Sequence, residues 1–275
     1  MSGEKPLTSA LSPQAGRGSR SPSPSPRVSR EREGPAPPGS ARSAARGQAP
    51  AWEGEGQRSF IVAIDGPAAS GKGTLARRLA ERFGFAHLDT GALYRATARL
   101  VLDAAGDPAD PATAEAAAHR VDPRLLADPR LRGDEVAVAA SVVAAIPEVR
   151  HALLALQRNF AAQPPAPAHG AVLDGRDIGT VICPVADVKL FVTASTEARA
   201  CRRVKELRAQ GAAAIYESVL QDLNQRDARD SERQAAPLAV APDAEVIDTT
   251  TLDADIVFER ASELVARTLK EKEWQ

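Results

Sequence analysis

The stretch DGPAASGKGT, residues 65–74, constrains the fold of this chain more than any other feature. Gly66 is the second residue of the stretch, and Lys72 directly follows Gly71. Together they give the spacing G-x-x-x-x-G-K. That spacing is typical of a loop whose backbone N–H groups wrap phosphates while the lysine reaches the β and γ phosphates. The predicted phosphate-binding residues are Gly66, Pro67, Ala68, Ala69, Ser70, Gly71, Lys72, Gly73 and Thr74.

The flanking sequence has the form that a phosphate-binding loop requires. The apolar run FIVAI at 60–64 contains β-branched residues and predicts a strand buried on both faces. Leu75, Leu79 and Phe83 then recur every four places, as on one face of a helix. Gly84 can end that helix. Strand, loop and helix therefore predict a nucleoside triphosphate site, and a glycine-rich turn with a solvated lysine is the alternative.

Further short apolar segments predict the rest of a parallel α/β fold. They are AHLD, AVLDG, VKLFVTA and AEVIDTT, at residues 86–89, 171–175, 188–194 and 244–250. Strands that alternate with helical stretches predict a parallel sheet with right-handed crossovers. Prolines interrupt the Ala-rich segment between Gly106 and Ile146, which predicts an insertion on the rim of the sheet.

A charge-dense run, QRDARDSERQAAPL at 225–238, follows another helical stripe. The apolar positions of that stripe are Ile215, Val219, Leu220 and Leu223. Most charge runs form solvated faces. We therefore expect the run at 225–238 to be exposed and mobile.

Overall charge and residue counts narrow the possible partners. The formal net charge is −1, so bulk electrostatics attracts neither nucleic acid nor an anionic membrane. The two cysteines, Cys183 and Cys201, form no disulfide framework, and the four histidines lack metal-ligand spacing. No apolar run approaches the roughly 18 residues that span a bilayer, and the N-terminus has no apolar signal core. We expect a cytoplasmic protein with no nucleic-acid or membrane partner.

Residues 1–57 differ in composition from the rest of the chain. Ser, Pro, Gly, Ala and Arg dominate this segment, as in SRSPSPSPRVSREREGPAPPGSARSAARG, and large aliphatic residues are nearly absent. Such a segment cannot bury enough apolar surface to offset its ordering entropy. We expect a disordered tail before a domain at 58–275. An Arg-Ser arm that touches RNA or phospholipid is the alternative, although its glutamates dilute the positive charge.

The residue after the lysine separates classes of phosphate-binding loop. In GTPases and motor ATPases a Ser or Thr there ligates Mg²⁺ directly, but here Gly73 follows Lys72 and Thr74 comes one place later. The form G-K-G-T resembles that of the nucleoside monophosphate kinases, where waters and the phosphates of both nucleotides hold the metal. The absence of an N-K-x-D guanine motif also argues against a GTPase.

Three more stretches carry a closer resemblance. They are LDTGALYR at 88–95, DGRDIGT at 174–180 and QRDARDSER at 225–233. With the loop at 65–74, they resemble the bacterial cytidylate kinases, from about Phe60 to about Leu269. The resemblance implies a P-loop fold with a parallel five-stranded sheet and transfer of a phosphoryl group from ATP to CMP or dCMP, with Mg²⁺ as cofactor.

The resemblance also implies how the domain is divided. The core would comprise 58–105 and 165–275, with a monophosphate-binding insert at about 106–150 and an arginine-rich lid at about 224–237. The stretch VDPRLLADPRLRGDEVAVAAS lacks a convincing hairpin, so the insert is shorter than in the longer bacterial members. A thinner wall beside the base would affect discrimination between bases rather than the chemistry. We expect a monomer.

The acceptor residues follow from the resemblance. Thr90 and Arg95 match family residues at the monophosphate, where a planar guanidinium suits a phosphate dianion. Ser141 and Arg150 match residues near the cytosine ring. Without the resemblance, Thr90 is a helix cap, Ser141 a small packing residue, and the two arginines are solvated charges.

The stretch DGRD places three charges at the carboxyl end of a strand, where ligands bind in open α/β sheets. The resemblance assigns Asp174 to the water shell of Mg²⁺, Arg176 to the acceptor phosphate and Asp177 to the base. The alternative is an ion pair within this turn, with a structural role only.

The resemblance places four charged residues of the lid at the substrates. Arg226 and Asp230 match residues at the ribose of the acceptor, and Arg229 and Arg233 match residues at the phosphates. Arginines so placed can raise the rate of phosphoryl transfer roughly a thousandfold, and a closing lid excludes water. The predicted catalytic residues are Lys72, Arg176, Arg229 and Arg233.

Two other functions remain open. One is a kinase for another monophosphate such as UMP, or for a small metabolite hydroxyl. The other is a non-catalytic sensor that binds ATP and reports it to a partner protein, for which the lid arginines would be dispensable.

Overall fold

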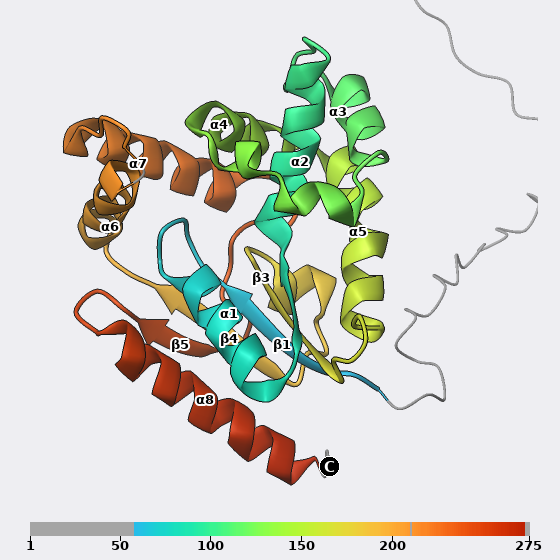
Figure 1. The fold of residues 1–275 in the computed structure, drawn as a ribbon, viewed down its shortest axis with the longest axis vertical. Helices are drawn as coiled ribbons and strands as arrows, with labels where there is room; N and C mark the ends of the chain where they lie inside the picture. The colour runs from blue at the N-terminus through green and yellow to red at the C-terminus, as the bar shows by residue number, and fades with distance from the viewer. Residues whose placement is uncertain (1–57, 210, 273–275) are drawn as a thin grey trace, which may run out of the picture. The chain divides into compact units, whose positions relative to one another are not determined.

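A parallel five-stranded sheet lies at the centre of the fold, as the sequence predicts (Figure 1). The computed structural model describes residues 58–209 and 211–272, and the predicted tail at 1–57 lies outside the described residues. The strands are β1 (Phe60–Asp65), β2 (Ala86–Asp89), β3 (Gly170–Gly175), β4 (Val188–Thr193) and β5 (Glu245–Asp248). All pairs are parallel, in the order β2-β3-β1-β4-β5, so the predicted strands are confirmed.

Helices connect the strands and cover the sheet. They are α1 (Lys72–Phe83), α2 (Thr90–Asp103), α3 (Pro111–Ala118), α4 (Asp134–Val143), α5 (Pro147–Ala162), α6 (Thr196–Ala209), α7 (Tyr216–Glu232) and α8 (Ala254–Glu271). Short helical turns lie at η2 (Pro123–Ala127), η3 (Pro129–Arg132) and η4 (Ile178–Ile182). The predicted end of α1 is confirmed, because Gly84 adopts the left-handed conformation (φ 65°) that favours glycine at a helix end.

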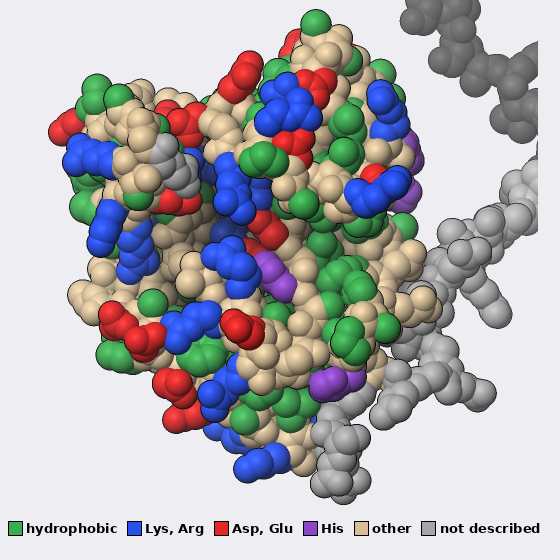
Figure 2. Space-filling model, viewed as in Figure 1, with side chains coloured by type: hydrophobic (Ala, Val, Ile, Leu, Met, Phe, Trp, Pro, Cys, Tyr) green, Lys and Arg blue, Asp and Glu red, His purple; other side chains and the backbone are tan. Residues whose placement is uncertain are grey.

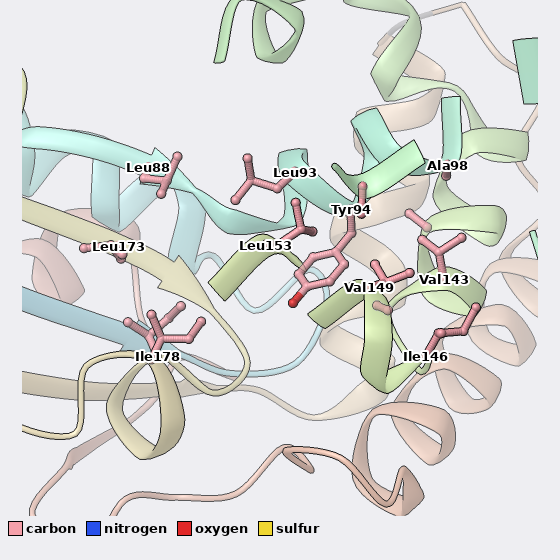
Figure 3. Packing of buried hydrophobic residues seen from close by; sticks show 14 of the residues in the cluster. Leu88, Leu93, Tyr94, Ala98, Val143, Ile146, Val149, Leu153, Leu173 and Ile178 are labelled. Carbon is pink, nitrogen blue, oxygen red and sulfur yellow. The ribbon is translucent and has the colours of Figure 1, made fainter. Parts of the chain in front are cut away.

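The apolar run of β1 serves both faces of the sheet. Ile61 and Ala63 point into one core, which the helices α2, α4 and α5 close, while Phe60, Val62 and Ile64 point into a second core beneath α1 and α8. Successive residues of a strand point to opposite faces, so a strand buried on both sides must be apolar throughout. The first of these cores also holds the aromatic ring of Tyr94 on α2 (Figure 3).

The insert at 106–150 is helical. Its described residues form α3, η2, η3, α4 and the first turn of α5, and none of them lies in a strand, so the expected lack of a hairpin is confirmed. Helix α4 packs against α2 beyond the carboxyl edge of the sheet (Figure 1). Within the described part of the chain no single helix has the length and apolarity to cross a membrane, although α4 and α5, bent by 99°, pass that test as a pair.

Helices α6 and α7 form a hairpin with a core of its own. Val204 and Leu207 of α6 pack against Val219 and Leu223 of α7. The predicted stripe is therefore confirmed at Val219 and Leu223, but it is wrong at Ile215, which caps α7 and is 64% exposed.

Candidate nucleotide-binding site

The loops that follow the strands meet at the carboxyl edge of the sheet. In an open parallel sheet this is the edge where ligands bind. The loop at 66–74 leaves β1 there. Only glycine fits at position 66, because a Cβ would lie 2.0 Å from the carbonyl oxygen of Val192 on β4. Gly71, with φ 93°, then turns the chain into α1. The loop therefore presents backbone N–H groups at the start of a helix, as phosphate binding requires.

Lys72 lies inside this loop rather than on its surface. Its side chain is buried, and Nζ donates a hydrogen bond to the carbonyl oxygen of Pro67 (3.2 Å). Burial, together with the nearby charges of Arg176 and Arg226, lowers the pKa of Lys72 to about 7. The alternative of a solvated lysine is therefore wrong. A buried ammonium repelled by arginines is stabilised when phosphate oxygens approach it.

Two residues from distant parts of the chain hold the loop in place. Thr249, after β5, donates from Oγ1 to the carbonyl oxygen of Ser70 (3.0 Å), and Arg199 of α6 donates to that of Ala68 (3.3 Å). Arg202 in turn donates from Nη1 to Thr249 Oγ1 (2.9 Å). The three are absent from the predicted site residues, and only their places just after β4 and β5 could have indicated them.

A cavity of about 190 Å³ adjoins the loop. Its wall combines loop and helix residues with residues that follow β4 and β5: Ser70, Gly71, Thr74, Leu75, Arg78, Arg202, Thr249, Leu252, Ala254 and Val257. The lining is apolar at Leu252 and Val257 and cationic at Arg78 and Arg202. A flat heteroaromatic ring beside an anion suits such a wall.

Thr90 lies at the junction of β2 and α2, beside β3. Its hydroxyl donates to the carbonyl oxygen of Asp174 (2.8 Å), and a Cβ at Gly175 would lie 2.5 Å from that hydroxyl. The cap of α2 is Asp89, whose carboxylate accepts from the N–H of Ala92 (3.1 Å). The helix-cap alternative for Thr90 is therefore wrong, because its side chain joins two strand ends instead.

Arg95 projects from the first turns of α2. Its guanidinium donates to Asp89 (2.7 Å), and its side chain is 24% exposed. Its positive charge is also one of the causes that lower the pKa of Arg226 on α7. The alternative of a solvated arginine is wrong, and an arginine paired with one carboxylate keeps donors for a second anion.

Asp177 lies between two arginines from different elements. Arg150 of α5 donates to its Oδ2, and Nη2 of Arg233 lies 3.6 Å from Oδ1. The three side chains are only 5%, 10% and 4% exposed, respectively. The alternatives of a surface charge for Arg150 and of an ion pair confined to the turn are both wrong.

Tyr94 of α2 and Ser141 of α4 are both buried. Ser141 Oγ finds no hydrogen-bond partner in the described ranges 58–209 and 211–272. The ring of Tyr94 lies 5.6 Å from the guanidinium carbon of Arg150. Tyr94 is absent from the predicted residues, although its place in LDTGALYR, one residue before Arg95, is a signal that could have found it.

The lid residues on α7 reach the same place. Arg176 donates to Asp230 (2.8 Å), and Arg233 Nη1 lies 3.9 Å from the other oxygen of that carboxylate. Burial would raise the pKa of Asp230, but the charges of Arg176 and Arg226 hold it below the usual range. The run at 225–238 was expected to be exposed. This expectation is wrong at Asp230 and Arg233, whose side chains form ion pairs with residues just after β3.

Two lid arginines have other surroundings. Burial lowers the pKa of Arg226 to about 10, with repulsion from Arg176 as the next cause. Arg229 donates to the carbonyl oxygen of Gln225 in its own helix (3.3 Å), and its charge repels Arg226. The fold therefore gathers the predicted acceptor and lid residues, apart from Ser141, into one cluster of contacts or close charges.

Comparison with known proteins decides the family. The model of the cytidylate kinase family matches residues 62–267. The chain belongs to the cytidylate kinase family. It is 61% identical to a cytidylate kinase of Paramagnetospirillum magneticum over 203 residues, 74% of this chain and 96% of the relative. It is 57% identical to one of Rhodospirillum rubrum and 58% identical to one of Granulibacter bethesdensis, over 75% and 76% of this chain and 97% of each relative.

Similarity to solved structures is lower. A gluconokinase from Sinorhizobium meliloti 1021 matches with a TM-score of 0.41 and 13% identity, over 80% of this chain and 99% of that protein. A protein of Thermus thermophilus matches with a TM-score of 0.42 and 23% identity, over 78% and 99%.

The family uses ATP with a divalent metal, and the residues near Lys72 fit a metal held mostly by phosphates and waters. Within the described residues no group of three His, Cys, Asp or Glu is placed to hold an ion. One carboxylate is suitably placed, because Asp174 Oδ2 faces Gly73 and would lie 3.6 Å from a Cβ there. Its other oxygen meets Nε2 of His87 (2.7 Å). Asp174 thus lies beside the start of α1, where it would hold the water shell of an ion.

Positive charge gathers at this edge of the cytidylate kinase fold. Figure 2 shows Lys and Arg side chains, with fewer acids, around a hollow on the face drawn. The depressed pKa values of Lys72 and Arg226 share Arg176 as a cause, so these cations repel each other in the free protein. Phosphate groups placed among them would relieve that repulsion.

Proposed function

We propose that this protein transfers the γ-phosphoryl group of ATP to CMP or dCMP, giving ADP and CDP or dCDP. The observation that supports the proposal most strongly is the contact between Arg150 and Asp177, at the edge where Lys72 and Arg176 also lie. A carboxylate and a guanidinium side by side match the amino group at N4 of cytosine and the acceptor at N3. Membership of the cytidylate kinase family agrees with this pairing.

The donor nucleotide occupies the first loop. Backbone N–H groups of 66–74 bind the phosphates, Lys72 reaches the β and γ phosphates, and the cavity beside Arg202 and Leu252 receives the base. Mg²⁺ bound to ATP would neutralise phosphate charge, and Asp174 would hold its water shell.

The acceptor nucleotide lies across from it. Arg95 and Arg176 hold its phosphate, Thr90 supports the turn beside it, and Arg226 and Asp230 face its ribose. Arg229 and Arg233 of the lid approach the transferring group, whose negative charge the cations stabilise. Positioning and charge stabilisation are sufficient, so no covalent intermediate with the protein is needed. The active unit in this proposal is a monomer.

A steady-state assay tests the proposal. With ATP and Mg²⁺, CMP and dCMP should give far higher kcat/KM than UMP, AMP or shikimate. A preference for UMP or shikimate would overturn the assignment of the acceptor. ATP binding without CDP formation would instead support the non-catalytic sensor.

A further inference from the structure

Asp65 links the two nucleotide loops through a single carboxylate. It is the last residue of β1 and directly precedes Gly66 of the phosphate-binding loop. Its side chain is buried, with Oδ1 accepting from the N–H of Ile178 (2.8 Å) and Oδ2 from the N–H of Gly179 (2.8 Å). These are the first two residues of η4 after Asp177. The end of the donor strand therefore holds the backbone that follows Arg176 and Asp177.

The contact satisfies donors that would otherwise lack a partner. The first N–H groups of a helical turn have no partner within the turn, and η4 has no side-chain cap of its own. The fit is close, because a Cβ at Gly179 would lie 3.4 Å from Asp65 Oδ2 and 3.1 Å from Lys189 Cδ. A larger residue at position 179 would contact this carboxylate and press on the side chain of Lys189. Asp65 thus fixes the position of the turn, and not merely its hydrogen bonds.

We propose that Asp65 is a positioning residue for the acceptor nucleotide: its ionised carboxylate anchors η4 and thereby sets Arg176 and Asp177 against the phosphate and the base. This role rests on the proposed function, since those two residues are its acceptor contacts. Asp65 itself touches neither nucleotide. We therefore expect Asp65 to affect the affinity for CMP. The affinity for ATP depends on the end of the 66–74 loop that enters α1.

The charges around Asp65 make this role depend on pH. Burial raises the pKa of Asp65 from 3.8 to about 6; the two N–H donors and Arg176 oppose the rise and Asp177 adds to it. Across the sheet its neighbours Gly175 of β3 and Phe191 of β4 are uncharged. The remaining ionisable groups on this side are Lys189 of β4, whose ammonium is bound by Asp243 (2.8 Å), and Cys183, whose pKa burial raises to about 12.

Protonation should therefore loosen the turn. A carboxylic acid has one oxygen that carries a proton, and that proton would face an N–H group instead of accepting from it. As the pH falls through about 6, CMP affinity should fall with the ionised fraction of Asp65. The phosphate of CMP titrates in a similar range, so the comparison must be made between variants rather than between pH values alone.

Asp65→Asn isolates the charge, because an amide of nearly the same shape presents an NH₂ to one of the two N–H groups. We expect its dissociation constant for CMP at pH 8 to rise by at least about tenfold, as for a lost charged hydrogen bond, and that for ATP to change by less than about twofold. As the pH falls from 8 to 5.5, the wild-type affinity should converge on that of the variant. Calorimetric titration of each nucleotide measures this without turnover.

Asp187→Asn is a matched control. Asp187 is a second buried carboxylate at the other end of β1, 1% exposed, and accepts from the N–H of Ile61 (2.7 Å). We expect it to lower the melting temperature but to leave CMP and ATP affinities unchanged at every pH. Gly179→Ala is a second route, because its methyl group would lie 3.1 Å from Lys189 Cδ and 3.4 Å from Asp65 Oδ2, so the Lys189 side chain or the turn must shift by a few tenths of an ångström. It should weaken CMP binding and spare ATP binding even if Asp65→Asn fails to fold.

The outcomes separate this inference from the proposed function. If the wild-type protein forms CDP while Asp65→Asn and Gly179→Ala bind CMP normally, or lose CMP and ATP affinity in parallel, the positioning role is refuted. A ratio of wild-type to Asp65→Asn affinity that does not change with pH refutes the role of the charge. Wild-type protein that forms no CDP refutes the proposed function itself.

Discussion

Lys72 is a predicted catalytic residue whose burial opposes folding. Its ammonium is buried, and burial together with Arg176 and Arg226 lowers its pKa from 10.5 to about 7. A basic group with a lowered pKa in the folded state binds fewer protons there than in the unfolded chain, so it costs stability, most below pH 7. That cost is relieved as the pH rises from about 7 toward 10.5.

We predict that Lys72→Met abolishes CDP formation yet raises the melting temperature at pH 6 to 7, by a few degrees. The methionine fills similar volume without a buried charge. Calorimetric unfolding and the coupled kinase assay measure the two effects on one preparation. A clear fall in the melting temperature would show that the hydrogen bond to Pro67 outweighs the buried charge.

Binding of ATP should also shift the titration of Lys72. Phosphate oxygens favour the charged ammonium, so at pH 8, where most of the free protein would carry neutral Lys72, ATP should bind with uptake of up to about one proton. Its affinity should therefore weaken as the pH rises above 7. Titrations in two buffers with different protonation enthalpies give the proton count. An uptake of zero at pH 8, with the affinity unchanged, would contradict the lowered pKa.

Asp177 should set the choice of pyrimidine. Cytosine offers a donor at N4 and an acceptor at N3, whereas uracil offers an acceptor and a donor at these places. A carboxylate and a guanidinium therefore fit cytosine and oppose uracil, and two charged hydrogen bonds at roughly 1.5 to 3 kcal/mol each allow a discrimination of about 10² to 10⁴.

We predict that Asp177→Asn lowers kcat/KM for CMP by at least about tenfold and that for UMP much less. Asn is preferred to Ala because it leaves a partner for Arg150 and Arg233, both of which are nearly buried. Steady-state kinetics with both substrates gives the ratio. An equal fall for both would place Asp177 at the phosphates or the metal and not at the base.

At the scale of elements, Arg199 connects the phosphate-binding loop to the lid helix. Its guanidinium donates to Ala68 in the loop and pairs with Asp227 of α7 (2.7 Å), and its side chain is 4% exposed. We predict that Arg199→Ala raises KM for ATP about tenfold and lowers the melting temperature, because the loop loses a support and α7 its link to α6. Asp227→Asn, which keeps the contact with Ala68, is the matched variant and should change KM for ATP by less than about twofold.

Short-range patterns predicted the elements but not the contacts between them. The run at 60–64, the glycines of the loop and the place of DGRD after a strand have local physical causes, and each was confirmed. The supports of the loop were not predictable in this way, because Thr249 lies 179 residues from Ser70 and Arg199 lies 131 residues from Ala68. Only the completed sheet brings such residues together.

The charged run at 225–238 is a second case in which the sequence does not predict contacts with distant residues. Sequence alone favours a solvated face for it, since an isolated charge run cannot reveal a partner. Asp230 and Arg233 are buried because Arg176 and Asp177 of a distant loop neutralise them. The predicted acceptor and lid residues came from the family resemblance, and contacts or close charges connect them in the structure, Ser141 aside.

At the scale of the whole molecule, the sheet order agrees with the proposed two-substrate site. β1 is the central strand, with β3 on one side and β4 on the other. The loop after β1 therefore lies between the predicted acceptor residues that follow β3 and the residues that follow β4 and β5. Asp65 accepts hydrogen bonds from the turn after β3, and Arg199 donates one to Ala68 in the loop.

Residues 1–57 should be dispensable for this site. The relatives align over 96–97% of their own lengths but over only 74–76% of this chain, and the family match begins at residue 62. Arg58 is the first described residue, and its guanidinium reaches the carbonyl of Val185 and the buried carboxylate of Asp187.

We therefore predict that a chain beginning at Gln57 keeps kcat, KM and melting temperature, whereas one beginning at Phe60 melts a few degrees lower because Asp187 loses Arg58 as a partner. Asp187 retains Lys272 (2.6 Å) and the N–H of Ile61, so the shorter chain should still fold and form CDP. Thermal melts and the CMP assay on the three lengths measure this. A large loss of kcat or melting temperature in the chain that begins at Gln57 would show that the segment before it contributes to the domain.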